Sequence, residues 1–570
     1  MEFETTRTFD VLVVGGGIAG TTAALHAARS EARTAIACTG ALFSGSSFYP
    51  GTWGLGLVGP ESPDDEDDLV RTIIEVGRGA ALPALVSTFV RDIPAAIDEL
   101  EATGVRLMRP DRPDEREFVP CFDRKRRLWR GIVREGYEEA VGRELARLGV
   151  EVLPGRTLVD LVERDGAIAG ALLAARGKAS FEVVGSNATV LATGGFGGLF
   201  ERRLTADDVA GGAHAVALAH GCALVNLEFM QMMPGLVSPK HGIVFNEKTF
   251  RHVSLRNPDG TDPLAGRPDA RALLEERSGH GPFTARLSSR AIDLAMDAAG
   301  PEGLAVRYRA DGAHDGAGNA ALPEFVRTYF DWLEKAAGIG PADELRIAPY
   351  AHAANGGILI DADGSCGAPG LFACGEATGG MHGADRIGGL SSANGLVFGR
   401  RAGRAAAAWA RKRAEATRGD VRDGGPLSAD VPACALPDAP ALARTLRRAM
   451  MESCMIVRTG DGLERALATI DELAGRASAE ARPSADAAEA AQTALLRHQI
   501  ALARAFATAA LARAESRGAH FRADFPAEDP AQARPLLVKL DAEGRPHARP
   551  LAPGGNDDPS RSGAAGGPRP

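Results

Sequence analysis

The first apolar run of the chain is followed at once by glycines and then by helical spacing. Phe9 to Val14 is a nearly continuous apolar stretch, which predicts a short buried strand. Gly15, Gly17 and Gly20 come next, and Thr21 to Arg29 has the composition of a helix. Strand, glycine turn and helix in this order are typical of a unit that binds a dinucleotide.

The alternation of strand-like and helix-like segments continues to about residue 234. It predicts an α/β domain of the doubly wound, Rossmann-like kind over residues 1–234. From 235 to 348 the glycine motifs disappear and the composition becomes mixed and polar, which we interpret as an inserted α+β capping domain. The first domain is expected to resume over residues 349–415.

Two stretches near the C-terminus place large apolar residues at helical spacing. One runs from Leu463 to Leu473 and the other from Leu495 to Leu511. They predict a C-terminal helical domain over residues 426–530, built from three helices. Residues 553–570 are rich in glycine, proline and serine, which predicts a disordered tail.

The glycines after the first strand have separate expected roles. Gly15 makes the turn, Gly17 admits a pyrophosphate, and Gly20 lets the helix pack closely on the strand. The N–H groups at the start of the helix would bind the phosphates. An acidic residue normally ends the second strand and holds a ribose, but this chain has Cys38 followed by Thr39, and Thr39 could donate only one hydrogen bond.

Two further glycine clusters favour FAD over a nicotinamide cofactor. Thr193, Gly194 and Gly195 follow a predicted strand, and Gly375 and Glu376 follow another. The Glu376 carboxylate is well suited to accept hydrogen bonds from ribityl or ribose hydroxyls. FAD is long, so several segments of the chain must line it, whereas a nicotinamide cofactor would not need all three clusters.

One histidine and one arginine stand beside further glycine runs. His352 precedes Gly356 and Gly357, and Arg386 precedes Gly388 and Gly389. An arginine binds a carboxylate through two parallel charge-assisted hydrogen bonds, and a histidine can add a third. Glycines let the backbone approach a flat ring closely. The two segments predict a site that holds a small carboxylic acid against a flavin.

Composition limits the remaining functions. The 570 residues exceed one core, and 45% hydrophobic with 24% charged residues is ordinary for a globular protein. The net charge of −9 argues against a nucleic-acid partner. No stretch approaches the ~20 apolar residues of a membrane span, and no signal region precedes the first strand, so we expect a cytoplasmic protein. The seven cysteines lack the spacing of an iron–sulfur or haem site, and no metal is expected.

These features resemble the flavoprotein family of succinate dehydrogenase, fumarate reductase and L-aspartate oxidase, from about residue 9 to residue 526. Within the family, the C-terminal motifs are most similar to L-aspartate oxidases. The motifs that carry the resemblance are Gly15–Gly20, Ser46–Tyr49, Ala192–Gly195, Asn226–Phe229, His352 with Gly356–Gly357, His382–Ser391, Ile456–Thr459, Leu463–Leu467 and Glu515–Phe521.

The resemblance implies roles for particular residues. His352 and Arg386 would bind a substrate carboxylate next to flavin N5, while Glu376, Ser391 and the Gly15–Gly20 loop would contact FAD. In the membrane-bound members a histidine bonded to the flavin lies near the position of Ser46-Ser47. Serine cannot form that bond, so the resemblance implies non-covalent FAD.

The chain departs from the family where a second substrate carboxylate would bind. Met233 stands in place of a histidine, Gly235 in place of a threonine, and Asn246 in place of a second threonine. Hydrogen-bond donors are lost, and an apolar thioether occupies their space. A buried unpaired carboxylate costs several kcal/mol. We therefore expect a substrate with one bound carboxylate and a less polar far end, which disfavours aspartate and succinate.

The group that exchanges a proton with the substrate stays open between two arginines. Arg286 matches the family position only if one residue is deleted, and Arg290 is the alternative. Glu247 matches the family's relay glutamate. Arg251 follows four residues later, so a path through Glu247 and ordinary surface ion pairing of these two side chains are both open.

The function expected from these features is that of an FAD-dependent oxidoreductase. A hydride would pass between flavin N5 and the carbon next to a carboxylate of a small organic acid, as in L-aspartate oxidase or fumarate reductase. The alternative is a flavoprotein electron-transfer subunit that works with a redox partner. The sequence leaves open the substrate, the direction of turnover, the electron donor or acceptor and the oligomeric state.

Overall fold

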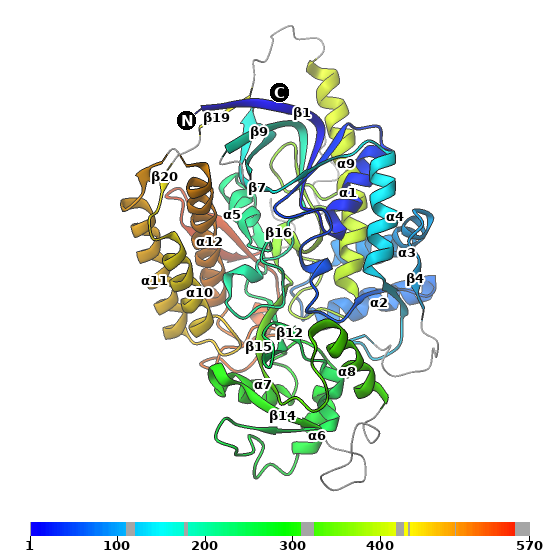
Figure 1. The fold of residues 1–570 in the computed structure, drawn as a ribbon, viewed down its shortest axis with the longest axis vertical. Helices are drawn as coiled ribbons and strands as arrows, with labels where there is room; N and C mark the ends of the chain where they lie inside the picture. The colour runs from blue at the N-terminus through cyan, green and yellow to red at the C-terminus, as the bar shows by residue number, and fades with distance from the viewer. Residues whose placement is uncertain are drawn as a thin grey trace.

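The computed structural model describes residues 2–109, 120–175, 180–308, 324–417, 427–430, 434–484 and 486–552. The predicted tail at 553–570 lies outside the described residues. Figure 1 shows a central α/β body, a group of elements at one end (green) and a bundle of helices along one side (brown). No helix in this described part of the chain is long and apolar enough to cross a membrane.

The largest sheet carries the predicted dinucleotide unit. Its order is β6-β2-β1-β9-β8-β7, with β17 also paired to β9. The strands β6, β2, β1, β9 and β17 pair in parallel, whereas β7 and β8 add an antiparallel hairpin. The bounds are β1 Glu2–Val14, β2 Thr34–Cys38, β6 Glu151–Pro154, β7 Arg156–Arg164, β8 Ala167–Ala175, β9 Ser180–Leu191 and β17 Leu371–Ala373.

Helices cover this sheet and complete the doubly wound body. Helix α1 begins directly after the first glycine turn and packs closely on the long helix α9 (Figure 1). The bounds are α1 Ile18–Arg29, α2 Pro63–Val76, α3 Pro83–Ala102, α4 Arg134–Arg147, α5 Gly212–Ala219 and α9 Leu390–Thr417. A small sheet beside them is made of β3 Leu55–Gly59, β4 Leu107–Met108 and β5 Leu128–Ile132.

The capping domain has a core of its own. Its sheet has the order β12-β11-β15-β14-β13, and a separate cluster of buried residues runs from Leu236 to Ile347. Strands β11 and β15 lead into and out of it as an antiparallel pair, with Met233 opposite Tyr350. The bounds are β11 Met230–Ser238, β12 Ile243–Val244, β13 Val253–Arg256, β14 Leu304–Tyr308, β15 Leu345–Ala354, α6 Ala270–Arg277, α7 Arg290–Ala298 and α8 Glu324–Ala337.

The C-terminal region forms three packed helices, as the leucine spacing predicts. They are α10 Ala439–Ser453, α11 Gly460–Ala479 and α12 Ala487–Ala512. The chain then adds a hairpin, β22 Leu536–Leu540 and β23 Pro546–Pro550, to a mixed sheet with β10 Leu224–Val225, β16 Gly357–Leu359 and β18 Thr378–Gly379. Short pairs are made by β19 Ser428–Asp430 with β1 and by β20 Cys434–Ala435 with β21 Arg482–Pro483. The hairpin ties the C-terminal region to the α/β body.

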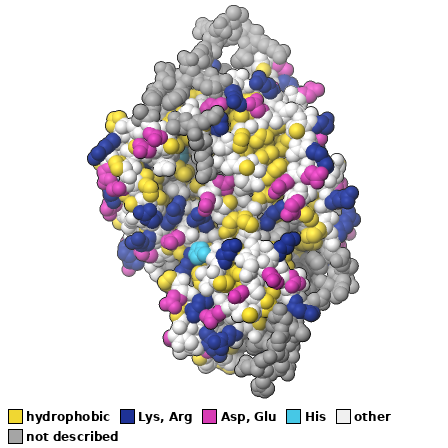
Figure 2. Space-filling model, in the orientation of Figure 1, with side chains coloured by type: hydrophobic (Ala, Val, Ile, Leu, Met, Phe, Trp, Pro, Cys, Tyr) yellow, Lys and Arg dark blue, Asp and Glu magenta, His cyan; other side chains and the backbone are white. Residues whose placement is uncertain are grey.

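The surface agrees with the charge balance of the sequence. On the face drawn in Figure 2, positive and negative side chains are interspersed rather than gathered by sign. The three parts of the structure confirm the predicted fold class, an α/β Rossmann-like domain with an inserted cap and a C-terminal helical domain.

Candidate active site

A cavity of about 340 Å³ lies where the glycine segments, the base of the cap and the start of α9 meet. Most of the predicted site residues line it. They are Gly15, Gly17, Thr39, Ser46, Ser47, Thr193, Gly194, Met233, Glu247, His352, Gly375, Glu376, Arg386 and Ser391. Gly20, Gly195, Asn246, Arg286 and Arg290 are not among the lining residues.

The first glycine turn separates packing roles from a binding role. Gly15 has φ +120°, and a Cβ on it would lie 2.2 Å from the Ala192 carbonyl oxygen. A Cβ on Gly20 would lie 1.9 Å from the Gly15 carbonyl oxygen, so α1 packs directly on the turn. A Cβ on Gly17 would meet nothing closer than Ser47 Oγ at 3.5 Å. Gly17 therefore faces open space in the cavity, where a phosphate can approach.

The end of β2 offers no carboxylate. Cys38 is buried, and a Cβ on Gly16 would lie 2.6 Å from its Sγ. Burial raises the pKa of the Cys38 thiol to about 12, and the nearby Asp208 carboxylate contributes to the rise, so the group is a neutral thiol. Thr39 lines the cavity one residue later.

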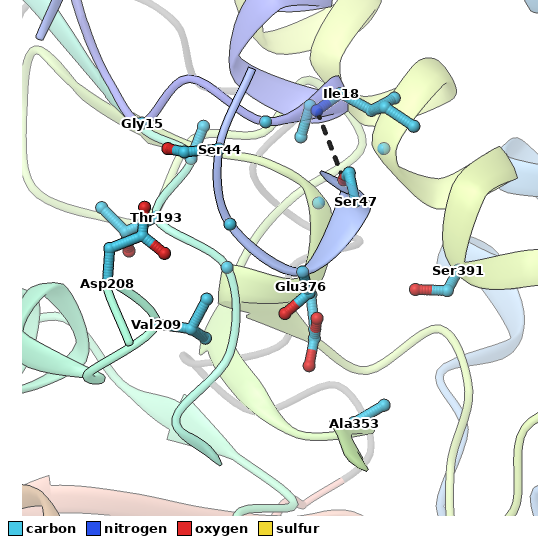
Figure 3. A pocket seen from close by; sticks show the side chains of 18 of the residues that line it. Gly15, Ile18, Ser44, Ser47, Thr193, Asp208, Val209, Ala353, Glu376 and Ser391 are labelled. Atoms are coloured by element: carbon cyan, nitrogen blue, oxygen red, sulfur yellow. Dashed lines mark hydrogen bonds between the residues drawn. The ribbon is translucent and has the colours of Figure 1, made fainter. Parts of the chain in front are cut away.

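Glu376 lies between the second and third glycine clusters. A Cβ on Gly195 would lie 2.4 Å from Glu376 Oε1, so only glycine fits behind this carboxylate. The Ala354 amide donates a hydrogen bond of 2.9 Å to the same oxygen. Burial raises the pKa of Glu376, against the lowering effects of that amide and of Arg386. Figure 3 shows its carboxylate directed into the cavity, between Thr193 and Ser391.

Four lining side chains have buried polar atoms with no hydrogen-bond partner among the described residues. They are Ser46 Oγ, Thr193 Oγ1, Asp208 Oδ1 and His352 Nδ1. Buried polar groups are normally paired, so these atoms indicate a ligand rich in hydroxyl and phosphate groups. Together with the glycine-lined walls, they fit a bound FAD.

His352 and Arg386 form the predicted carboxylate clamp at this cavity. Arg386 is buried, and its Nε donates a hydrogen bond of 3.1 Å to Gln231 Oε1. Burial lowers the pKa of Arg386. Burial, with a smaller contribution from Arg386, lowers the pKa of His352 to about 3, so the imidazole is neutral at pH 7. An anion bound here would pair the guanidinium and favour protonation of His352.

Met233 belongs to a cluster that contains no cation. A Cβ on Gly281 would lie 3.2 Å from Met233 Cε and 3.5 Å from Glu247 Oε1. The Gly281 amide donates to Cys121 Sγ at 3.3 Å, and the thiol donates to Glu247 Oε1 at 3.5 Å. We call Met233, Glu247, Cys121 and Gly281 the Met233 cluster. All four line the cavity, and their only charge is negative.

Two positions that differ from the family have structural explanations. A Cβ on Gly235 would lie 2.6 Å from the ring of Tyr350, whose hydroxyl donates to the Leu236 carbonyl at 2.7 Å. Tyr350 therefore fills the space that a threonine side chain would need. The Asn246 side chain accepts a hydrogen bond from the Lys248 amide at 2.9 Å and caps the short helix Glu247–His252.

Neither candidate arginine reaches the cavity in this structure. Arg286 Nε pairs with Asp385 Oδ2 at 2.9 Å, and its guanidinium lies 5.0 Å over the ring of Phe122. Arg290 donates to the Ala285 carbonyl and lies over the Phe521 ring. Of the predicted proton-exchanging groups, Glu247 is the one that lines the cavity.

The structure also gives Arg251 a different neighbour from the one considered in the relay. Its guanidinium lies 3.6 Å from Glu275 Oε1. This ion pair involves side chains that are partly exposed, and it agrees with the surface-pairing alternative for Arg251.

Sequence reasoning missed three groups that line the cavity. Asp208 follows the second glycine cluster, Cys121 follows the loop before β5, and Leu495 comes from α12 of the C-terminal domain. None of them belongs to a motif with its own spacing. The polar pair Asp207-Asp208 close to a glycine cluster was the one available signal for Asp208.

Comparison with known families agrees with this geometry. The description "FAD binding domain" matches residues 10–392, and "Fumarate reductase flavoprotein C-term" matches residues 443–542. The L-aspartate oxidase of Caulobacter vibrioides is 30% identical over 548 residues, covering 93% of this chain and 96% of that protein. A fumarate reductase (CoM/CoB) chain of Methanothermobacter marburgensis is 28% identical over 570 residues, covering 94% and 97%.

Solved structures show the same fold. The chain is similar to Mycobacterium smegmatis Sdh1 in complex with UQ1, with a TM-score of 0.74, 24% identity and coverage of 96% of this chain and 94% of that chain. It is also similar to a quinol-fumarate reductase with menaquinol molecules, with a TM-score of 0.73, 23% identity and coverage of 96% and 98%.

Proposed function

The chain belongs to the flavoprotein family of succinate dehydrogenase, fumarate reductase and L-aspartate oxidase and is an FAD-dependent oxidoreductase; on that premise we propose its substrate class. The proposed reaction moves a hydride between flavin N5 and the carbon next to the carboxylate of a small organic acid. The acid carries one carboxylate and an uncharged far end. The observation that carries this proposal is the Met233 cluster, which offers no cation to a second carboxylate.

FAD would be held by the cavity walls without a covalent bond. Gly17 leaves space for the pyrophosphate, while Ser46, Thr193 and Glu376 offer hydrogen-bonding groups. Ser46 stands where the membrane-bound members carry their linking histidine, and a serine hydroxyl does not form that bond. The bound flavin supplies the hydride chemistry, and the protein supplies position and charge.

His352 and Arg386 would orient the acid. The Arg386 guanidinium keeps one hydrogen bond to Gln231 through Nε and can present its remaining N–H groups to a carboxylate. The unpaired His352 Nδ1 adds a donor once the ring is protonated. Two cationic groups on the carboxylate draw electrons from the adjacent carbon, which favours hydride transfer to or from the next carbon.

The Met233 cluster decides what the rest of the acid can be. The Met233 thioether and the Cys121 thiol give weak hydrogen bonds at most, and Glu247 would repel a second carboxylate. A charge buried without a partner costs several kcal/mol, so a dicarboxylate is disfavoured here. An apolar or hydroxylated far end is accommodated.

Glu247 is the proposed proton-exchanging group. It lines the cavity, whereas Arg286 is held by Asp385 outside it. The Glu247 carboxylate could accept a proton from the substrate or return one, with Cys121 as its immediate neighbour. Arg286 or Arg290 would take part only after a movement that frees its guanidinium.

The alternative function is that of a subunit that passes electrons to a redox partner. The similar fumarate reductase and Sdh1 proteins support this second candidate, because their names place them in assemblies or complexes with electron carriers. It predicts a flavin that small acids reduce but that neither oxygen nor an unsaturated acid reoxidises without the partner.

An anaerobic acid screen tests the proposal. Purified protein is mixed with saturated monocarboxylates, hydroxy acids, aspartate and succinate, and the flavin absorbance is followed. We expect bleaching by at least one monocarboxylate and little change with succinate or aspartate. Rapid bleaching by succinate or aspartate, with none by a monocarboxylate, would refute the proposed substrate class. Admission of oxygen afterwards tests the alternative.

A further inference from the structure

Asp208 lines the cavity beside the end of β2. A Cβ built on Gly40, two residues after the last residue of β2, would lie 3.6 Å from Asp208 Oδ2. Ser44 approaches the same point, with its Oγ 3.7 Å from that Cβ. The Asp208 carboxylate is also close enough to contribute to the raised pKa of the Cys38 thiol. Asp208 thus belongs to the part of the cavity where β2 ends.

The Asp208 carboxylate lacks a partner within the described part of the protein. Its Oδ1 is buried and accepts no hydrogen bond, although the residue as a whole is partly exposed to the cavity. A carboxylate oxygen buried without a donor is unfavourable, so a ligand donor at this position is expected. Figure 3 shows the Asp208 side chain beside Thr193, with Ser44 across the space next to them.

The end of the second strand is where a dinucleotide fold holds the adenosine ribose. An acidic side chain there normally accepts hydrogen bonds from the ribose hydroxyls. This chain has a buried neutral Cys38 at that point, and Thr39 offers a single hydroxyl. The carboxylate missing from β2 is available instead from the segment that follows the second glycine cluster.

We propose that Asp208 accepts hydrogen bonds from the adenosine ribose hydroxyls of FAD and so replaces the acid that β2 lacks. The assignment concerns cofactor recognition and does not depend on which acid is the substrate. Because FMN and riboflavin lack this ribose, Asp208 contributes to the choice of FAD.

Asp207 provides a matched control for the neighbouring charge. Its side chain is 94% exposed and pairs with Arg203 at the surface. A neutral residue at 207 changes the net charge as a neutral residue at 208 does, but it removes nothing from the cavity. Any effect of general charge on flavin binding would therefore be common to the two variants.

The test measures FAD binding to the flavin-free full-length protein. Wild type, Asp208→Ala, Asp208→Asn and Asp207→Asn are titrated with FAD and with an FAD analogue whose adenosine lacks the 2′- and 3′-hydroxyls. Binding is followed by quenching of flavin fluorescence. Circular dichroism and thermal unfolding of the flavin-free proteins check that each variant folds, and Asp208→Asn serves if Asp208→Ala does not.

We expect Asp208→Ala to weaken FAD binding by about tenfold or more, as for loss of hydrogen bonds to a charged group. Asp207→Asn should bind FAD as the wild type does. The wild type should prefer FAD to the deoxy analogue, and Asp208→Ala should lose that preference. Unchanged or tighter FAD binding in Asp208→Ala would overturn the assignment, as would an equal loss of affinity for FAD and for the analogue.

Discussion

At the scale of single residues, the cavity provides one cationic clamp and one cluster without a cation. His352 and Arg386 make the clamp, and Arg386 is the charge that an acid would neutralise. Met233 and Glu247 face the same cavity and would repel or leave unpaired a second carboxylate. The substrate class therefore follows from the side chain at position 233 as much as from the clamp.

Restoring a donor at position 233 should change the preference between acids. Met233→His places an imidazole beside Glu247, where it can donate to a second carboxylate. We expect the dissociation constant of succinate to fall by about tenfold or more relative to that of butyrate. The constants are measured from changes in the flavin spectrum. Met233→Leu, which keeps an apolar side chain of similar size, should leave the ratio as it is in the wild type.

The low pKa of His352 predicts a pH dependence of acid binding. The free imidazole has a pKa of about 3, so it is neutral near pH 7. A bound carboxylate raises that pKa, so the complex takes up a proton and binding strengthens as pH falls. Butyrate titrations between about pH 6 and pH 8 stay above the pKa of the acid itself, which is similar to that of Glu. His352→Asn should remove the dependence, and an equally steep dependence in that variant would contradict the role of His352.

Sequence reasoning located the residues that belong to spaced motifs and not those that other segments bring in. His352, Arg386 and Glu376 stand beside glycine runs, and the structure gathers them at one cavity. Asp208 and Cys121 reach it through turns of the chain that no local pattern specifies. The position of the Arg286 guanidinium depends on Asp385, 99 residues away, and such a partner cannot be read from local spacing.

At the scale of elements, the junction of β1 and α1 combines close packing with an open binding surface. Gly20 allows the helix to touch the turn, whereas Gly17 leaves its side of the turn free. The sequence predicted these two roles from the order of strand, glycines and helix. The two glycines can therefore be separated by experiment.

Alanine at each of these glycines should give different defects. Gly20→Ala puts a Cβ 1.9 Å from the Gly15 carbonyl oxygen, so the flavin-free protein should unfold at a lower temperature. Gly17→Ala meets nothing closer than 3.5 Å and should keep the stability of the flavin-free protein, but its methyl group intrudes where the pyrophosphate binds. We expect weaker FAD binding in fluorescence titrations of Gly17→Ala. Normal FAD affinity in that variant would contradict the assignment of the loop.

The elements that the sequence did not predict are those whose partners are distant in the chain. The hairpin of β22 and β23 was missed because β22 pairs with β10, more than 300 residues earlier. Helices α11 and α12 were predicted because their apolar residues recur at helical spacing within each segment. Local periodicity thus identified helices, and long-range pairing escaped it.

At the scale of the whole molecule, a buried charged network joins the C-terminal domain to the α/β body. Arg513 pairs with Glu228 Oε1 at 2.6 Å and with Glu515 Oε1 at 3.0 Å, and Arg517 pairs with Glu515 Oε1 at 2.7 Å. All four side chains are at most 3% exposed. Such a network contributes little when complete but is costly when one partner is removed.

Neutralising Glu515 should therefore lower the stability of the assembled protein. Glu515→Gln keeps the shape but leaves two buried guanidinium groups short of charge, so the free energy of unfolding should fall by about 3–5 kcal/mol. Chemical denaturation of the flavin-loaded protein measures it. Glu464→Gln, at an exposed position of α11, is the control and should have no effect. Equal stability of the two variants would show that the network does not hold the domains together.

The binding preference of the wild-type protein tests the account most directly. Oxidised, flavin-loaded enzyme is titrated with butyrate and with succinate, which differ only in whether the far end is a methyl group or a carboxylate, and the dissociation constants are taken from the flavin spectrum. The account predicts that butyrate binds more tightly, because the clamp holds one carboxylate and the Met233 cluster offers nothing to a second. Tighter binding of succinate would contradict it.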